Sequence, residues 1–402
     1  MPNKNEVTHV LNHIQLNPSA EIRLKRGHLW IYSNEINNLK TPLKSFETGE
    51  LINIHDSFGN NLGVGYINPH NLLAARLLTR DPAEPIDTVF FQKRFHQALM
   101  LRQTLFSQPY YRLIYGESDG LPGLVIDRFG EAFVIQINTA GIEKLKNEII
   151  SALLKTTHAQ CIIIKNASSE RANEGMEKYT EIAYGQLPDP CIIEENQCQF
   201  MIDLLNGQKT GWFYDHRFNR ARIATYCNDK DILDVFCYTG AFTLPSAKVA
   251  KQVVAIDSSS TALSQLDENC KLNALKNVIT HPGKAQQELE NLNNAGKKFD
   301  VIILDPPAFI KRKKDYPAGL KAYQHINEAA MRLLNPHGIL LSASCSMHLS
   351  ADDLLLCLAK AGHKVGRQPI VLEQCHQAPD HPIHPSIPET NYLKGFIVAM
   401  QT

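Results

Sequence analysis

The chain has 402 residues, with 41 Lys and Arg against 41 Asp and Glu, and 44% of its residues are hydrophobic. This composition excludes disorder and fibrous repeats as the main organisation, and the length predicts roughly two or three domains. The start of the chain lacks the apolar stretch of a signal peptide, no apolar run is long enough for a membrane span, and the nine scattered cysteines contain no CxxC pair. We therefore expect a cytoplasmic protein with no membrane contact, disulfide framework or zinc ribbon.

Residues 1–78 carry the pattern of short strands separated by glycine turns. Charged and apolar side chains alternate over 21–32, which predicts a half-exposed strand and turn. The segments 49–56 and 61–67 flank Ser57-Phe-Gly-Asn60 and predict a hairpin, and 74–78 predicts a further strand. This first segment is interpreted as a small β-barrel.

Residues 79–190 begin at the proline-rich breaker Asp81-Pro-Ala-Glu-Pro85 and predict a middle α+β domain. Apolar residues at helical spacing predict a helix over 88–104 and another over 142–154. A hairpin is expected from 124–127 and 132–137, with its turn at 128–130, and a strand from 161–164.

Residues 191–402 alternate apolar strands with amphipathic stretches. Strands are expected at 232–236, 252–256, 278–280, 300–304 and 338–344, with a last strand near 392–400 that pairs antiparallel at the end. This alternation predicts an α/β domain with a doubly wound, mostly parallel sheet covered on both faces.

The loops after these strands are the expected ligand site, because open α/β sheets bind ligands at the carboxyl ends of their strands. The first loop, Asp234-Val-Phe-Cys-Tyr-Thr-Gly-Ala-Phe242, has one glycine and lacks GxGxxG. A nucleoside cofactor without a pyrophosphate therefore suits it better than a dinucleotide, which disfavours a nicotinamide dehydrogenase. Asp257 after the second strand can bind ribose hydroxyls, although a helix N-cap would explain the same residue.

Two further loops carry reactive or rigid groups. Asp305-Pro-Pro fixes the backbone after the fourth strand and is followed by four basic residues, 311–314, that favour phosphate contacts. Cys345 ends the fifth strand and is a candidate nucleophile, whereas most other cysteines are interpreted as small core residues. The histidines in 375–384 lack metal-ligand spacing and are interpreted as loop residues.

Upstream of the sheet, residues 208–217 interleave aromatic and basic side chains, with Arg220 and Arg222 close behind. Such a stretch can stack on a base and contact a phosphate, or can be a packed helix start.

Together these motifs resemble the bacterial 23S ribosomal RNA cytosine-C5 methyltransferases of the large-subunit methyltransferase I type. The resemblance covers nearly the whole chain. It rests on Arg26-Gly-His-Leu-Trp-Ile-Tyr32, Gly63-Val-Gly-Tyr66, Gly116-Glu-Ser-Asp-Gly-Leu-Pro-Gly123, Asp127-Arg-Phe-Gly130, Lys209-Thr-Gly211, Asp215-His-Arg217, Phe236-Cys-Tyr-Thr-Gly240, Asp305-Pro-Pro-Ala-Phe309 and Ser344-Cys-Ser346. It implies a PUA domain over 1–78, a middle domain over 79–190, and over 191–402 a Rossmann-like class I methyltransferase domain with a seven-stranded sheet.

The resemblance also implies S-adenosylmethionine as the cofactor and 23S ribosomal RNA, free or in a partly assembled subunit, as the substrate. Cofactor contacts are implied for Lys209, Thr210, Gly211, Phe213, Arg217, Asp234, Phe236, Cys237, Tyr238, Thr239, Gly240, Phe242, Asp257, Ser258, Asp305 and Pro306. Cys345 would add to cytosine C6, and Asp305 would hydrogen-bond the base. Substrate contacts are expected from Pro307, Phe309, Lys311, Arg312, Lys313 and Lys314, and in the barrel from Arg23, Lys25 and Arg26.

The chain departs from the methyltransferase pattern after the third strand, where His281-Pro-Gly-Lys-Ala285 has no acidic residue for the adenine amino group. Two alternatives remain: an RNA guanine methyltransferase of the same fold, and a non-catalytic RNA-binding protein with a degenerate methyltransferase domain. The modified nucleotide, the assembly state of the RNA and the oligomeric state, including a homodimer, stay open.

Overall fold

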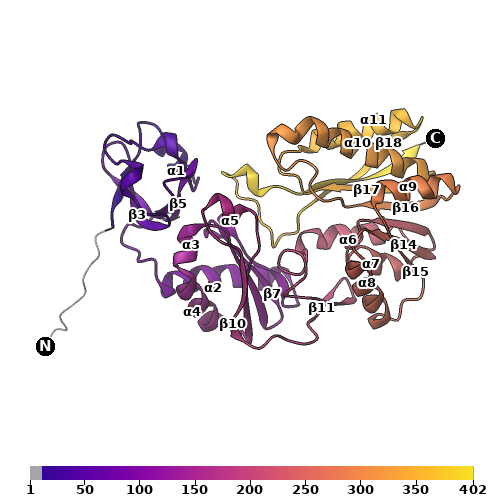
Figure 1. Ribbon diagram of the computed structural model, residues 1–402, viewed down its shortest axis with the longest axis horizontal. Helices are drawn as coiled ribbons and strands as arrows, with labels where there is room; N and C mark the ends of the chain where they lie inside the picture. The colour runs from indigo at the N-terminus through magenta and orange to yellow at the C-terminus, as the bar shows by residue number, and fades with distance from the viewer. Residues whose placement is uncertain (1–10, 402) are drawn as a thin grey trace. The chain divides into compact units, whose positions relative to one another are not determined.

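The computed structural model describes residues 11–401. Within them the chain divides into two compact units, each built from more than one stretch of sequence (Figure 1). The first unit comprises residues up to 189, 203–212 and 382–390, and the second comprises 190–202, 213–381 and 391 onward. In the described part of the chain no helix is both long and apolar enough to cross a membrane.

The first unit begins with a five-stranded sheet of order β1-β3-β4-β5-β2. Its elements are β1 (His13–Gln15), α1 (Glu21–Lys25), β2 (Trp30–Tyr32), β3 (Glu50–His55), β4 (Asn61–Ile67) and β5 (Leu73–Thr79). The predicted hairpin is confirmed as the antiparallel pair β3–β4. The strand expected over 21–32 is confirmed only at its end, as β2, and is wrong at its start, because Glu21–Lys25 forms a helix that buries Leu24 and leaves Ile22 exposed. Five residues are too few to distinguish a period of 2 from one of 3.6.

The same unit contains a second five-stranded sheet of order β10-β9-β8-β7-β6. Its elements are α2 (Thr88–Leu105), β6 (Tyr110–Tyr115), β7 (Leu124–Phe129), β8 (Ala132–Ile137), α3 (Ala140–Lys144), α4 (Lys146–Thr156), β9 (Cys161–Asn166), α5 (Glu170–Asn173) and β10 (Tyr179–Gly185). The expected hairpin is confirmed as β7–β8, but the expected second helix is broken at Leu145 into α3 and α4.

The second unit holds a seven-stranded sheet of order β15-β14-β13-β16-β17-β19-β18. Its elements are β11 (Ile192–Glu195), β12 (Cys198–Met201), α6 (Arg217–Ala224), β13 (Asp231–Val235), α7 (Thr243–Ala247), β14 (Gln252–Asp257), α8 (Ser260–Leu272), β15 (Val278–Pro282), α9 (Ala285–Asn294), β16 (Phe299–Leu304), α10 (Tyr316–Leu333), β17 (Leu334–Ser344), α11 (Ala351–Lys364), β18 (Gln368–His376) and β19 (Lys394–Gln401).

Five strands of this sheet are parallel, and β19 runs antiparallel to both β17 and β18, as the sequence predicted for the last strand. The sequence did not predict β18. This edge strand buries only Cys375 and contains Pro369, so it lacks the apolar run that marks the inner strands.

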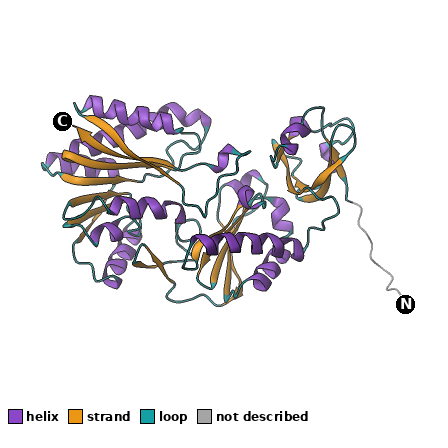
Figure 2. Ribbon diagram, turned by 180° about the vertical axis from the view of Figure 1, so that it is seen from behind, coloured by secondary structure: helices purple, strands orange, loops and turns teal. Residues whose placement is uncertain are grey.

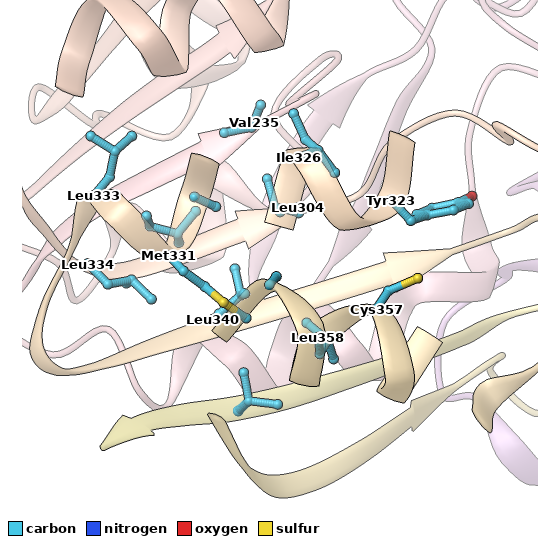
Figure 3. Close-up of a cluster of buried hydrophobic side chains, with 14 of the residues drawn as sticks. Val235, Leu304, Tyr323, Ile326, Met331, Leu333, Leu334, Leu340, Cys357 and Leu358 are labelled. Atoms are coloured by element: carbon cyan, nitrogen blue, oxygen red, sulfur yellow. The ribbon is translucent and has the colours of Figure 1, made fainter. Parts of the chain in front are cut away.

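Successive residues of the inner strands pack into different cores, which explains their continuous apolar runs. In β16, Ile302 and Leu304 join one cluster with α10 and α11, whereas Val301 and Ile303 join another with α6 and α7. Figure 2 shows helices on both sides of this sheet, and Figure 3 shows the first cluster. The predicted doubly wound, mostly parallel seven-stranded sheet is therefore confirmed.

Candidate functional site

The strand order places a topological switch point between β13 and β16, the neighbouring strands from which the chain continues in opposite directions. A ligand crevice is expected outside their carboxyl ends. The loops after β13, β14, β16 and β17, which carry Gly240, Asp257, Asp305 and Cys345, all leave the sheet at this edge because these strands are parallel.

The loop after β13 is shaped by its backbone. Phe236, Tyr238 and Gly240 have φ values of 68°, 49° and 93°, a region that L side chains rarely adopt. The carbonyl of Ile256 accepts the N–H groups of Phe236 and Cys237, at 2.9 and 3.1 Å. At Gly240 an added Cβ would lie 2.6 Å from Leu244 Cδ1 and 3.0 Å from Leu266 Cγ, so the turn requires glycine.

Asp257 fastens this loop to the next one. One carboxylate oxygen accepts the Tyr238 N–H at 3.0 Å and the other accepts the Ser259 N–H at 2.9 Å. Ser259, rather than Asp257 or the exposed Ser258, supplies the N-cap of α8. Each oxygen of a carboxylate has about two lone-pair sites, so both Asp257 oxygens can still accept from ribose hydroxyls.

Asp234 lies beneath the loop and is fully enclosed. Its carboxylate accepts the Thr243 hydroxyl at 2.6 Å. Burial raises the pKa of Asp234 to about 7, although the Thr243 hydrogen bond works in the opposite direction. With 1% of its surface exposed, Asp234 supports the loop from below.

These residues fit S-adenosylmethionine. The loop turns its backbone without a pyrophosphate cradle, and Asp257 supplies the acceptor that a ribose needs. Thr239 Oγ1 is buried and has no hydrogen-bond partner among the described residues. After β15 the sequence has no acid, but Glu288 of α9 folds back so that its Oε1 lies 2.6 Å from where a Cβ on Gly283 would stand. A carboxylate is thus present at the loop where the sequence showed none.

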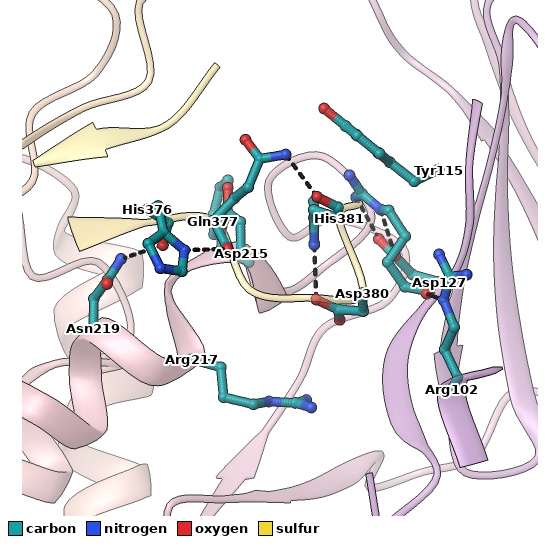
Figure 4. Close-up of polar contacts among 12 residues, drawn as sticks. Arg102, Tyr115, Asp127, Asp215, Arg217, Asn219, His376, Gln377, Asp380 and His381 are labelled. Atoms are coloured by element: carbon teal, nitrogen blue, oxygen red, sulfur yellow. Dashed lines mark hydrogen bonds and ion pairs between the residues drawn. The ribbon is translucent and has the colours of Figure 1, made fainter. Parts of the chain in front are cut away.

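The loop after β16 holds Asp305 against a buried histidine. His216 Nε2 lies 3.3 Å from Asp305 Oδ1, and the two side chains are 5% and 28% exposed. The Asn219 amide nitrogen lies 3.0 Å from His216 Nδ1 and donates to the His376 carbonyl (Figure 4), which assigns the ring proton to Nε2, toward Asp305. Burial by itself lowers the pKa of His216, but the Asp305 carboxylate outweighs it, so the pKa is raised.

Ser344-Cys-Ser346 after β17 is held by Tyr323 of α10. The Tyr323 hydroxyl lies 2.7 Å from Ser344 Oγ and 2.8 Å from Ser346 Oγ. Ser346 Oγ also accepts the Ile310 N–H at 3.2 Å, and the Phe309 ring lies 4.8 Å from the Tyr323 ring. One tyrosine therefore contacts both the Asp305-Pro-Pro loop and the serines that flank Cys345.

Cys345 differs from every other cysteine of the chain. All nine lie within the described residues, and eight are buried, whereas Cys345 is partly exposed. Burial raises the pKa of Cys237, Cys270 and Cys375, which makes these thiols poor nucleophiles.

The expected substrate-contacting residues fall into two groups. Lys311, Arg312, Lys313 and Lys314 are all exposed, and Arg312 pairs with Asp315 at 3.1 Å. In the first unit Arg23 pairs with Glu35 at 2.7 Å, and Lys25 pairs with Asp56 at 3.3 Å. Arg23 and Lys25, which the sequence analysis expected to contact RNA, are therefore paired with acidic side chains of the same unit.

The stretch 208–217 is divided between the two units. Lys209, Thr210 and Gly211 belong to the first, where the Thr210 hydroxyl donates to Asp127 at 2.5 Å. In the second, Arg217 and Arg220 both pair with Glu195, at 3.2 and 2.7 Å. The start of α6, with Arg217 and Arg220, therefore fits the alternative interpretation, a packed helix start. Contact between the stretch 208–217 and a cofactor stays a prediction.

Three residues at this edge were missed by sequence reasoning: Glu288, Tyr323 and Lys394. His216 entered only as part of the motif Asp215-His-Arg217, without its contact to Asp305. Lys394 is the only one with a usable signal, because the expected antiparallel last strand begins at the edge where Cys345 ends its own strand.

Comparison with known proteins supports the same interpretation. Residues 14–80 match the family model for a PUA-like domain, and residues 178–385 match that for an S-adenosylmethionine-dependent methyltransferase. The Ribosomal RNA large subunit methyltransferase I of Shewanella denitrificans is 36% identical, covering 96% of this chain and 98% of that protein. The protein of the same name from Escherichia coli O139:H28 is 37% identical, covering 94% and 96%.

Solved structures share the fold. One described as a methyltransferase complexed with SAH has a TM-score of 0.83 at 20% identity, over 97% of this chain and 100% of that one. A SAM-dependent methyltransferase described from Streptococcus mutans has a TM-score of 0.81, also at 20% identity and with the same coverage. At this identity the likeness concerns the fold alone.

Proposed function

The chain belongs to the ribosomal RNA large subunit methyltransferase I family, and we propose that it forms 5-methylcytosine in 23S ribosomal RNA through a covalent adduct on Cys345. It is an S-adenosylmethionine-dependent ribosomal RNA methyltransferase with an N-terminal PUA-like domain. The choice of cytosine and of carbon C5 goes beyond that membership and rests on the site.

The observation that carries the proposal is the partly exposed Cys345 at the carboxyl end of β17, at the same sheet edge as Asp305. Cytosine C5 is too weak a nucleophile to accept a methyl group unaided. Addition of the Cys345 thiolate to C6 moves electron density onto C5. C5 would then bond to the methyl carbon of bound S-adenosylmethionine while the bond from that carbon to sulfur breaks and S-adenosylhomocysteine leaves. Loss of the C5 proton to a base returns an electron pair, and elimination of the thiolate restores the aromatic ring.

Asp305 is proposed to orient the target base. Its carboxylate is partly exposed and faces His216, so one side of the group is fixed and the other is open to a ligand. A hydrogen bond from the cytosine amino group, or from a protonated N3, would favour the adduct. The two prolines after Asp305 restrict the backbone and prevent a helix from starting there, which limits the movement of the carboxylate.

The cofactor is proposed to lie over the loop after β13, with Asp257 on the ribose hydroxyls and Glu288 near the adenine amino group. S-adenosylmethionine supplies an electrophilic methyl group when it is bound there. The exposed basic residues 311–314 follow the Asp305 loop and would contact RNA phosphates. The target nucleotide must leave its stack to reach Cys345.

The test is methyl transfer from labelled S-adenosylmethionine to unmodified 23S ribosomal RNA, followed by nucleoside analysis. We expect the label in 5-methylcytosine, and we expect Cys345→Ala to reduce transfer by roughly a thousandfold or more because the nucleophile is lost. The matched control is Cys357→Ala, a buried cysteine of α11, which should keep most of the activity.

Three outcomes would overturn the proposal. Label in a guanine derivative, or full activity of Cys345→Ala, would favour the RNA guanine methyltransferase. A failure of the wild-type protein to bind S-adenosylmethionine in calorimetry would favour the non-catalytic RNA-binding protein.

A further inference from the structure

Lys394 begins β19 beside the nucleophile. Because β19 runs antiparallel to β17, its first residue pairs with Ser344, the last residue of β17 and the one before Cys345. The Lys394 ammonium donates to the carbonyl of Ser346 at 2.8 Å, the residue after Cys345. Lys394 thus contacts the chain on both sides of the cysteine.

This lysine is buried without a carboxylate. Only 8% of its surface is exposed, and among the described residues no Asp or Glu carboxylate contributes to its electrostatics. A buried ammonium is costly unless it has a counter-charge. Burial lowers the pKa of Lys394, and negative charge on Cys345 works in the opposite direction.

The titratable groups on the elements packed against Cys345 have partners of their own. Burial raises the pKa of Tyr323 of α10, although the hydrogen bonds with the two flanking serines work in the opposite direction, so its hydroxyl is neutral at pH 7. His376, the cross-strand neighbour of Lys394 on β18, has its Nδ1 at 2.9 Å from the Gln377 carbonyl. Asp305, after the adjacent strand β16, faces His216.

We propose that Lys394 is a positioning residue that acts as the counter-ion of Cys345 and keeps this side chain as a thiolate at neutral pH. The inference rests on the proposed function, in which Cys345 is the nucleophile. Packing alone does not explain a buried lysine, because an apolar side chain would fill the same space with a smaller desolvation penalty. A role as counter-ion does explain the buried charge. The thiolate in turn supplies the negative charge that the buried ammonium needs, and the hydrogen bond to the Ser346 carbonyl fixes the position of that ammonium.

The experiment measures the rate of alkylation of Cys345 by iodoacetamide, a neutral reagent, between pH 5 and 10 in the full-length protein. Peptide mass analysis reports the modified residue, and Cys345→Ala gives the background from the buried cysteines. In the wild type we expect the midpoint below the value of about 8.5 that an ordinary thiol shows. In Lys394→Met we expect it about one pH unit higher or more, with alkylation at pH 7 roughly tenfold slower.

Two further variants separate charge from packing. Lys394→Arg keeps the charge and should restore most of the low midpoint. Lys251→Met removes an exposed lysine next to the amino end of β14, at the opposite edge of the sheet, and should leave the midpoint unchanged. If Lys394→Met does not fold, the wild-type profile still decides, because a wild-type midpoint at or above about 8.5 overturns the proposal.

The readout also separates this inference from the function. A midpoint that stays the same in folded Lys394→Met, while Cys345→Ala abolishes methyl transfer, would overturn the role of Lys394 alone. A low midpoint that depends on Lys394, together with full methyl transfer by Cys345→Ala, would support the ion pair and overturn the cytosine-C5 mechanism.

Discussion

The two halves of the ligand edge are built in different ways. Over β13 and β14 the loops are held through their backbone N–H groups: the Ile256 carbonyl accepts two of them, and the Asp257 carboxylate accepts two more. Over β16 and β17 the loops are held by side chains, with the Tyr323 hydroxyl between two serine hydroxyls and His216 against Asp305.

This difference indicates which amino-acid substitutions each half of the edge can tolerate. A loop built from backbone groups depends on conformation, so most side chains there can vary while glycine cannot. A loop built from side-chain hydroxyls depends on the chemical identity of a few residues, and the loss of one oxygen leaves others without a partner. The following predictions would sharpen or break this contrast, from the largest expected effect to the smallest.

Gly240→Val should have the largest effect. The added carbons would collide with Leu244 and Leu266 at a positive φ, so the loop after β13 cannot keep its path. We expect S-adenosylmethionine affinity by calorimetry to fall by roughly a hundredfold or more, and stability to fall by about 2–4 kcal/mol.

The matched control is Gly296→Val, which also has a positive φ but has nothing within 4 Å of an added Cβ. It should lose stability from the strained backbone and keep cofactor affinity. Equal loss of affinity in both variants would show that packing at Gly240 is not what shapes the loop.

Tyr323→Phe should have an intermediate effect confined to the other half. Removal of one oxygen takes a partner from both Ser344 and Ser346, so the Ser346–Ile310 hydrogen bond alone would still join the Cys345 turn to the Asp305 loop. We expect kcat for methyl transfer to fall about tenfold. S-adenosylmethionine affinity should stay unchanged, because the backbone-built half does not use this hydroxyl.

The control is Tyr316→Phe at the start of the same helix, whose hydroxyl bonds Asp353 instead. It should keep kcat. A fall in cofactor affinity in Tyr323→Phe would contradict the division of the edge into two halves.

Asp234→Asn should have the smallest effect, and it should depend on pH. Burial raises the pKa of Asp234 to about 7, so the folded protein favours the protonated carboxyl. The stability this gives is complete below the ordinary Asp pKa of about 4, falls as pH rises above that value, and is gone once the buried group ionises above about 7. The asparagine variant stays neutral and should gain a few degrees in Tm over the wild type at pH 8.

Near pH 4 the two proteins should melt at nearly the same temperature, and the difference should grow from there to about pH 7, as measured by differential scanning calorimetry. A Tm difference that does not change between pH 5 and pH 8 would show that Asp234 does not titrate in this range.

The sequence predicted the sheet well because its inner strands are apolar on both faces. The runs around Leu233 and Ile302 are too short and too continuous for helices and are separated by amphipathic stretches, which leaves few alternatives. The edge strand β18 and the short helix α1 were missed because neither buries enough residues to impose a period.

Sequence reasoning found candidate site residues mainly where they lie at, or directly after, the carboxyl end of a predicted strand. Asp257, Asp305 and Cys345 could be found in this way, because strand ends alone bring them to one edge. Lys394, Tyr323 and His216 reach that edge from other elements, and their contacts depend on strand register and helix rotation. These features arise from packing over long sequence distances, and no local pattern encodes them.

The path of the chain between the two units has a consequence for synthesis. The chain crosses from one unit to the other five times, and residues 382–390 complete the first unit although they are among the last to be made. The first unit therefore cannot gain its last segment until nearly the whole chain has been made, whatever structure its earlier segments have formed by then. Cleavage of the chain at any of these crossings would place the segments of at least one unit on two different fragments.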